Sequence, residues 1–147
     1  MKISTKGRYA IALMLDIAEH SDQGNVSIKD VAKRQGISLK YLEQIVNMLS
    51  KAGLLKSQRG IQGGYKMLRS PDKYTIGDIL RVTEGSMAPI DGIGDGAIEE
   101  GLNMRDCPTI KFWKGFYETI NDYIDGTTIA DIMEEDAKLR EYQGYYI

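Results

Sequence analysis

Residues 28–49 read IKDVAKRQGISLKYLEQIVNML, which is two short helical patterns that meet at a glycine. Apolar residues recur at three- and four-residue spacing up to Gly36, where a residue of positive φ would end a helix. Ser38 then offers an N-cap for a second helix, and the apolar positions of that helix are Leu39, Leu42, Ile45, Val46 and Leu49. Helix, glycine turn and helix predict a helix-turn-helix, although a plain helical hairpin would give a similar pattern.

The segments on either side extend this unit to a winged helix-turn-helix. An amphipathic helix is predicted over residues 5–20, and turn formers at residues 21–25 end it. Residues 54–57 and 65–68 are typical of two strands, and the tip between them contains three glycines in five residues. Because the tip lacks the Gly-Lys-Ser/Thr ending of a nucleotide-binding P-loop, a hairpin wing is the better interpretation.

The second half of the chain is predicted to be helical apart from one long loop. Thr75 and Asp78 form a capping-box pattern at the start of a helix that ends near Glu84. Residues 85–107 are rich in glycine and are interpreted as a flexible loop. A long amphipathic helix resumes near Thr109.

The fold class is therefore mainly α with a small β-wing. We divide the chain into a winged helix-turn-helix domain over residues 1–84, a loop over residues 85–107, and a long dimerisation helix with its C-terminal tail over residues 108–147. Within the last part, Thr127 or Thr128 is expected to cap a final helix.

One face of the long helix is too aromatic for an isolated surface helix. Its members are Phe112, Trp113, Phe116, Ile120, Tyr123 and Ile124. We expect this face to be buried against its copy in a second subunit, which predicts a homodimer. The chain is then expected to end in an apolar tail over residues 142–147.

Charge is distributed unevenly along the chain, although the formal net charge is −2. Residues 1–73 contain 13 Lys and Arg against 6 Asp and Glu, whereas residues 74–147 contain 6 against 15. The net charges of the two parts are thus +7 and −9. A basic first half attracts phosphates, so we expect the winged domain to bind double-stranded DNA. The rival interpretation is a winged helix that docks on a protein, and the basic residues of the wing disfavour it.

Other classes of protein are disfavoured by the composition. Cys107 is the single cysteine, which excludes an intramolecular disulfide and fits a reducing cytoplasm. No stretch reaches the roughly 20 apolar residues of a membrane helix, so no membrane association is expected. We expect no enzymatic activity, because the sequence has no nucleophile elbow and no metal-ligand cluster, and its one histidine, His20, lies far from Cys107 along the chain.

Five stretches resemble, in order, those of the Rrf2 family of bacterial transcription regulators. They are MKISTKGRYA at residues 1–10, ISLKYLEQ at 37–44, RGIQGGY at 59–65, ILRVTEG at 79–85, and the run over 113–131. This resemblance covers nearly the whole chain. It implies a homodimeric transcription regulator with two winged heads that bind a pseudo-palindromic operator. We expect this regulator to act as a repressor, although the sequence alone does not distinguish repression from activation.

The resemblance also implies which residues contact DNA. Major-groove contacts are assigned to Ser38, Lys40, Tyr41, Glu43 and Gln44, and minor-groove contacts to Arg59 and Gly60. Lys2, Lys6 and Arg8 are expected from their charge to contact phosphates, which position a protein without reading sequence. Side-chain chemistry supports these roles, because Gln44 can bond an adenine edge and Glu43 can accept from a cytosine amino group. Arg59 beside a glycine suits a narrow minor groove. Alternatives stay open for Tyr41, as a packing residue, and for Glu43, as a solvated partner of a lysine.

The sequence departs from the family pattern in its cysteines. Members that bind an iron–sulfur cluster carry three cysteines before the long helix, and here Cys107 stands alone. One thiolate per chain does not make a convincing cluster site, so we predict no cofactor and no metal. The chain therefore resembles the cluster-free branch of cysteine-metabolism repressors, in which a regulatory enzyme or a small-molecule effector supplies the signal. Cys107 is interpreted as a structural or incidental thiol, with redox sensing as the alternative.

Overall fold

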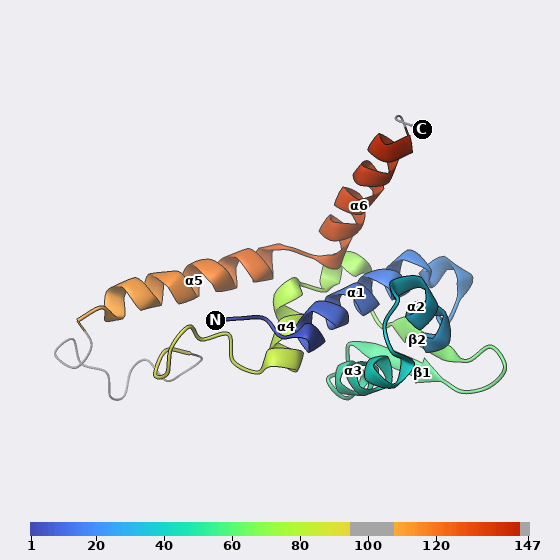
Figure 1. Ribbon diagram of the computed structural model, residues 1–147, viewed down its shortest axis with the longest axis horizontal. Coiled ribbons are helices and arrows are strands. Elements are labelled where there is room, and N and C mark those ends of the chain that lie inside the picture. Colours follow the sequence, from blue (N-terminus) through green and yellow to red (C-terminus); the bar gives the residue numbers. More distant parts are fainter. Residues whose placement is uncertain (95–107, 145–147) are drawn as a thin grey trace.

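The computed structural model describes residues 1–94 and 108–144. Its helices are α1 (Thr5–Glu19), α2 (Ile28–Gln35), α3 (Leu39–Lys51), α4 (Ile76–Glu84), α5 (Ile110–Gly126) and α6 (Ile129–Gly144). Two short 3-10 turns, η1 (Ser21–Gln23) and η2 (Pro71–Lys73), lie between them. Strands β1 (Leu55–Gln58) and β2 (Gly64–Met67) pair antiparallel. The mainly α fold with a small β-wing is confirmed (Figure 1).

The helix ends follow the local signals of the sequence. Gly36 adopts φ 65°, a left-handed conformation in which glycine carries no steric penalty, and α2 ends there. Ser38 caps α3, since its Oγ accepts a hydrogen bond from the backbone N–H of Tyr41. Both bonds of the capping box between Thr75 and Asp78 are present at the start of α4. The predicted helix-turn-helix is therefore formed by α2 and α3.

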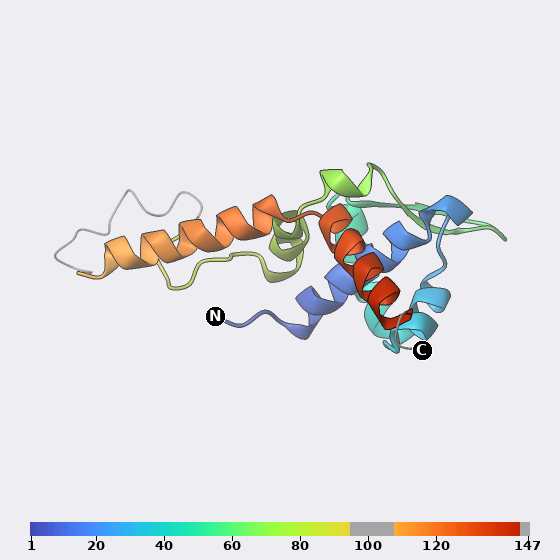
Figure 2. The same ribbon diagram turned by 90° about the horizontal axis from the view of Figure 1, so that it is seen from above.

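The core of the winged domain lies where α1, α3 and α4 pack against one another (Figure 2). The apolar stripe of α1 is fully buried at Leu13, Met14 and Ile17. Tyr74 is also fully buried, and its hydroxyl accepts from the backbone N–H groups of Leu68 and Arg69 at 2.9 and 3.0 Å. The buried Tyr74 hydroxyl thus accepts hydrogen bonds from two backbone N–H groups at the point where the chain leaves the wing. These bonds hold the wing against the core.

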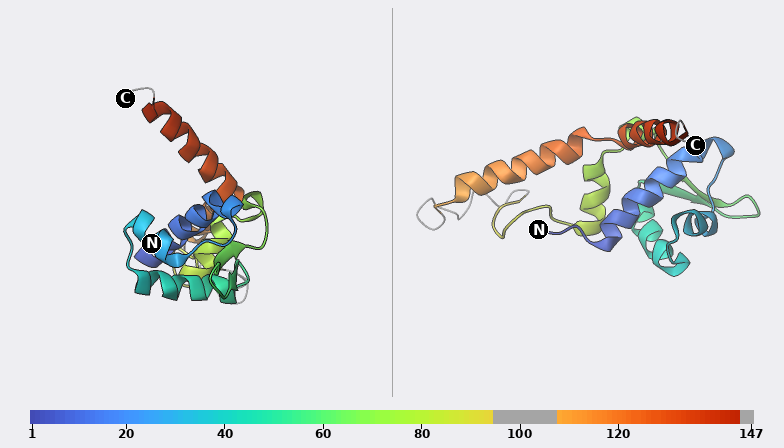
Figure 3. Two further views of the ribbon diagram at one scale, coloured as in Figure 1. Left: turned by 90° about the vertical axis from the view of Figure 1, so that its right-hand side faces the viewer. Right: turned by 45° about the horizontal axis from the view of Figure 1, so that its top comes forward.

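Helix α5 extends from the body as a long arm, and α6 turns away from it at a steep angle (Figures 1 and 3). The arm packs on α4. Two short extended segments, 74–76 and 127–129, pair at its base: Ile76 N–H donates to the carbonyl of Thr127 at 2.8 Å, and Ile129 N–H donates to the carbonyl of Tyr74 at 2.9 Å. We call this backbone pairing the elbow. It fixes the start of α4, the end of α5 and the start of α6 relative to one another.

The C-terminal region confirms one expectation and departs from another. Of the two expected caps, Thr128 caps α6, because its Oγ1 accepts from Asp131 N–H at 3.1 Å while the Asp131 carboxylate accepts from Thr128 N–H at 2.9 Å. The helix also continues to Gly144, so Tyr142 belongs to α6 rather than to an apolar tail. Charged residues spaced three and four apart along α6, among them Lys138, form ion pairs that support the extra turns.

The predicted loop is described in its first part. Residues 85–94 contain no helix or strand, but Met87 and Ile93 are buried and join the apolar core. The rest of the loop, including Cys107, lies outside the described residues, as does the end of the predicted tail, residues 145–147. No described helix has both the length and the apolar character that crossing a membrane requires.

Candidate nucleic-acid interface

Helix α3 presents a polar, exposed face that begins at its first turn. The residues predicted to read the major groove are exposed at Ser38, Lys40, Glu43 and Gln44 and half-buried at Tyr41. The opposite face is buried and consists of Leu42, Ile45, Val46 and Leu49. Two faces of opposite character fix the rotation of α3, so its polar side chains point away from the core.

Tyr41 has a packing role on this surface. Its ring meets the ring of Tyr9 on α1 edge to face, with centroids 5.7 Å apart. Such a contact fixes the start of α3 against α1. The packing interpretation of Tyr41 is therefore supported by its contacts, and the half-buried side chain leaves part of its surface exposed.

The wing carries a concentrated positive charge. Lys56 of β1 lies directly opposite Lys66 of β2, and both side chains are exposed. Like charges at facing positions of an antiparallel pair repel each other, and neither lysine has an acidic partner among the described residues. An anion placed over this pair would relieve the repulsion.

The tip of the wing is open to solvent. Arg59 and Gly60 are exposed, and the side chain of Ile61 is fully exposed. Gly60 adopts φ 115° and accepts a hydrogen bond from Gly63 N–H at 3.0 Å, which closes the turn at the tip. Arg69, by contrast, stacks over the ring of Tyr74 at 4.7 Å and is engaged at the base of the wing.

The N-terminal segment is tied to α4. Ser4 caps α1 through its Oγ and donates from the same hydroxyl to the carboxylate of Glu84 at 2.6 Å. The residues predicted to contact phosphates are exposed at Lys2 and Arg8 and half-buried at Lys6. The bond between Ser4 and Glu84 thus holds the segment that carries Lys2, Lys6 and Arg8 beside α4.

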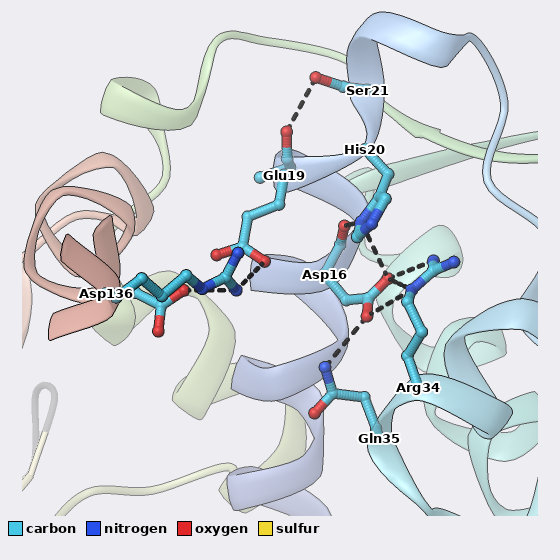
Figure 4. Close-up of polar contacts among 9 residues, drawn as sticks. Asp16, Glu19, His20, Ser21, Arg34, Gln35 and Asp136 are labelled. Atoms are coloured by element: carbon cyan, nitrogen blue, oxygen red, sulfur yellow. Dashed lines mark hydrogen bonds and ion pairs between the residues drawn. The ribbon is translucent and has the colours of Figure 1, made fainter. Parts of the chain in front are cut away.

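A buried carboxylate joins α1 to α2. Asp16 is 1% exposed and accepts hydrogen bonds from Arg34 and from Gln35 Nε2 (Figure 4). His20 Nδ1 donates to the backbone carbonyl of Asp16 at 2.8 Å. Burial alone would raise the pKa of Asp16, but the hydrogen bonds from Arg34 and Gln35 outweigh it, so this pKa is lowered. The charged form of Asp16 is the one that fixes α2 in place.

The next turn of α1 contacts α6. Glu19 lies close to Asp136 and to Arg140, whose Nη2 is 3.4 Å from the Glu19 carboxylate. Burial, together with the hydrogen bond to Asp136, raises the pKa of Glu19. Figure 4 shows this contact on one side of α1 and the Asp16 cluster on another.

The predicted dimerisation residues on α5 divide into two groups. Phe112, Phe116 and Tyr123 are exposed, at 63%, 37% and 74%. Trp113 and Ile120 are half-buried, and Trp113 stacks edge to face with both phenylalanines. Ile124 belongs to the core of this protomer, because it is 7% exposed and faces inward on α5. The aromatic spacing alone could not separate these two faces.

The exposed part of this stripe borders a shallow apolar groove on α5. It is lined by Lys111, Phe112, Gly115, Phe116, Thr119 and Ile120. At the other end of α5, Arg81 of α4 donates to Asp125 at 2.7 Å and to Asn121 at 2.7 Å. The base of the arm is thus anchored through polar contacts while its outer face stays apolar.

A family model, Rrf2, described as "Iron-dependent Transcriptional regulator", matches residues 3–135. The chain belongs to the Rrf2 family of transcriptional regulators. Among the relatives of this Rrf2 protein, the regulator CymR of Bacillus subtilis is 37% identical over 147 residues, which is 100% of both chains. The regulator IscR of Aliivibrio salmonicida is 36% identical over 136 residues, covering 92% of this chain and 79% of IscR.

Solved structures agree with the family assignment. The structure of CymR, titled the global cysteine regulator of B. subtilis, matches with a TM-score of 0.78 and 36% identity, over 92% of this chain and 98% of that one. Both the winged helix-turn-helix fold and the class of transcription regulator predicted from the sequence are confirmed.

The description of the Rrf2 model raises the question of iron. An iron–sulfur cluster needs several thiolate ligands, and this sequence supplies Cys107 alone. Its one histidine, His20, could add at most a single nitrogen ligand per chain. In the described part of the chain, no three His, Cys, Asp or Glu side chains gather closely enough to bind a metal ion. The donor set of this Rrf2 protein does not fit a cluster.

Sequence reasoning missed one candidate on the recognition surface of this Rrf2 protein. Asn47 is exposed on α3 and lies one turn beyond Glu43 and Gln44. The family motif used for the prediction ends at Gln44, whereas helical spacing of three and four residues would have included Asn47.

Proposed function

We propose that this Rrf2 protein binds a pseudo-palindromic operator as a homodimer and represses transcription in the cytoplasm. The observation that carries the proposal is the surface formed by α3 and the wing. Every residue predicted to read a base edge from α3 is exposed or half-buried. The wing beside α3 bears a pair of facing lysines, Lys56 and Lys66, that have no acidic partner in the described part of the chain. Polar side chains that can bond to bases suit a DNA groove, and the basic hairpin beside them suits the phosphates.

Each side chain on this surface has a role that its chemistry permits. In the major groove, Gln44 pairs with an adenine edge and Glu43 accepts from a cytosine amino group. Lys40 contacts a base edge or a phosphate, and Ser38 holds the helix start through its cap. Arg59 enters the minor groove from the tip of the wing, where the potential is most negative if the groove is narrow.

The apolar face of α5 supports the homodimer. Phe112 and Phe116 are large, exposed and contiguous with an apolar groove, a combination that is unusual on a monomer surface. A second copy of the same helix covers this face through a two-fold interface. Two winged heads are then held at a fixed separation and bind two half-sites together.

The test begins with purified protein and a pool of random-sequence duplexes. Rounds of selection should enrich an inverted repeat, and affinity for it should fall steeply as salt is raised. Arg59→Ala should weaken binding to the enriched duplex by about 1–3 kcal/mol. Lys138→Ala, which removes a lysine already paired with Glu134 on α6, is the matched control and should leave affinity unchanged. A pool with no enriched sequence would overturn the proposal.

The groove assignment of Arg59 has its own check. Replacing adenine by 2,6-diaminopurine adds an amino group in the minor groove and leaves the major-groove edge of the base intact. Wild-type protein should lose affinity for such a duplex, and Arg59→Ala should lose less. Equal losses of affinity in the two proteins would show that Arg59 does not contact the minor groove.

A further inference from the structure

The turn before α2 lies along the edge of the wing. Val26 N–H donates to the carbonyl of Tyr65 at 2.8 Å, and Tyr65 N–H donates back to the carbonyl of Val26 at 2.8 Å. Gly64, next to this pair, has φ 152°, and a Cβ there would lie 2.5 Å from the Val26 carbonyl oxygen. The backbone of this turn therefore adds a third extended segment to the wing at a single residue.

Asn25 extends this contact toward the tip. Its Nδ2 donates to Gln58 Oε1 at 2.8 Å and to the backbone carbonyl of Gln62 at 3.2 Å. Gln58 is the last residue of β1, and Gln62 precedes β2. One side chain from outside the wing thus bonds both arms of the hairpin, on either side of Arg59 and Gly60.

The chemistry of these contacts requires an amide nitrogen. Both partners of Asn25 are carbonyl oxygens, which accept hydrogen bonds and would repel another oxygen at the same place. The Oδ1 atom of Asn25 is buried and has no hydrogen-bond partner among the described residues. The orientation of the amide is therefore set by the wing.

The tip has little else to hold it. Two strands of four residues each are marginal as an isolated hairpin, and Arg59, Gly60 and Ile61 are all exposed. A flexible tip would lose conformational entropy on entering a groove, and a group that orders it beforehand reduces that loss.

We propose that Asn25 is a positioning residue that holds the wing tip in the conformation that presents Arg59 to the minor groove. This inference rests on the proposed function, since it concerns how Arg59 reaches DNA. Asn25 itself does not need to contact DNA for this role. Its effect on affinity passes through Arg59.

The test is a double-mutant cycle on the duplex that wild-type protein selects. Asn25→Ala should weaken binding about five- to tenfold, in line with the loss of two hydrogen bonds. In an Arg59→Ala background, the same change should weaken binding less than about twofold, because the side chain that Asn25 positions is gone. An equal loss of affinity in both backgrounds would show that Asn25 does not act through Arg59. No loss of affinity in either background would show that Asn25 has no role in binding.

Matched variants separate positioning from folding and from charge. Gln23→Ala truncates an amide on the neighbouring turn that makes no side-chain bond to the wing, and it should leave affinity unchanged. Asn25→Asp keeps the shape but replaces the donor with an acceptor, so it should bind more weakly than Gln23→Asp, which adds the same charge nearby. Melting temperatures of all variants should stay close to that of wild type, because the affected bonds lie at the surface.

A second readout does not depend on DNA. The backbone N–H of Gly63, bonded to the Gly60 carbonyl across the tip, should exchange with solvent faster in Asn25→Ala than in wild type, measured by hydrogen exchange on the free protein. Unchanged exchange would overturn the positioning role even if an operator is found. If exchange is faster in Asn25→Ala but wild-type protein selects no duplex, the contact between Asn25 and the tip is supported. That result would count against the proposed function instead.

Discussion

Arg34 of α2 donates to both carboxylate oxygens of Asp16 on α1, from Nε at 3.2 and 3.1 Å and from Nη2 at 2.6 Å. Asp16 is buried, whereas the Arg34 side chain is 36% exposed. The first helix of the helix-turn-helix is thus attached to α1 by a forked ion pair as well as by apolar packing.

This pair predicts a specific dependence of stability on pH. Because the pKa of Asp16 is lowered by folding, its ionised form stabilises the protein above the unfolded value of about 3.9, and this contribution is lost as pH falls through the lower folded pKa. Asp16→Asn should reduce the free energy of unfolding at neutral pH by about 1–3 kcal/mol and flatten this acid limb. Urea unfolding across the acidic range measures both effects.

The control for that experiment is Asp22→Asn, which changes an exposed carboxylate on η1. Its curve of stability against pH should follow that of wild type. If Asp16→Asn also runs parallel to wild type down to the acid end, the Asp16–Arg34 pair is not responsible for the acid limb.

The same pair illustrates how far the sequence could predict this structure. The helices, the glycine turn, the wing and the capping box of α4 were predicted correctly because caps and apolar spacing act within a few residues. Asp16 and Arg34 are 18 positions apart, and Asn25 and Gln58 are 33 apart, so only the fold brings them together. Ile124 was assigned to the dimer face because periodicity shows that a helix has an apolar face without showing what covers it.

A second prediction concerns the arm. Phe116→Glu should make the protein monomeric at micromolar concentration, because the charge would be buried in the apolar interface of the proposed dimer. Sedimentation measures the change, and operator affinity should fall by at least about 100-fold once the half-sites are bound separately. Glu118→Lys, which alters charge on another exposed face of α5, should remain dimeric. A dimeric Phe116→Glu protein would mean that another surface holds the subunits together.

A third prediction uses the facing lysines of the wing. Lys66→Gln should raise the free energy of unfolding by about 0.2–1 kcal/mol, since it removes the repulsion from Lys56. The same change should weaken DNA binding and reduce the slope of log affinity against log salt by about 0.9, the value for one lost phosphate contact. A substitution that raises the free energy of unfolding but weakens DNA binding indicates that the charge serves ligand binding rather than stability. Lys138→Gln, the control, should change neither the affinity for DNA nor its dependence on salt.

A fourth prediction concerns the contact between α4 and α5. A Cβ on Gly77 would overlap the carboxylate of Asp125 and lie 2.7 Å from Arg81 Nη1. Gly77→Ala should therefore destabilise the protein while Asp125 is present. In an Asp125→Ala background the same change should destabilise the protein less, because the carboxylate that the Cβ would overlap is gone. Denaturant unfolding of the four proteins measures this difference, and an equal loss of stability in both backgrounds would contradict it.

The elbow is built from main-chain atoms. Hydrogen bonds between residues 74–76 and 127–129 do not depend on which side chains stand there, provided that each residue keeps its N–H. Substitutions can therefore accumulate on the outer surface of α3 without disturbing the angle at which the head meets the arm. In the proposed dimer, relatives of this protein could therefore evolve to recognise new operator sequences while the distance between the two half-sites stays the same.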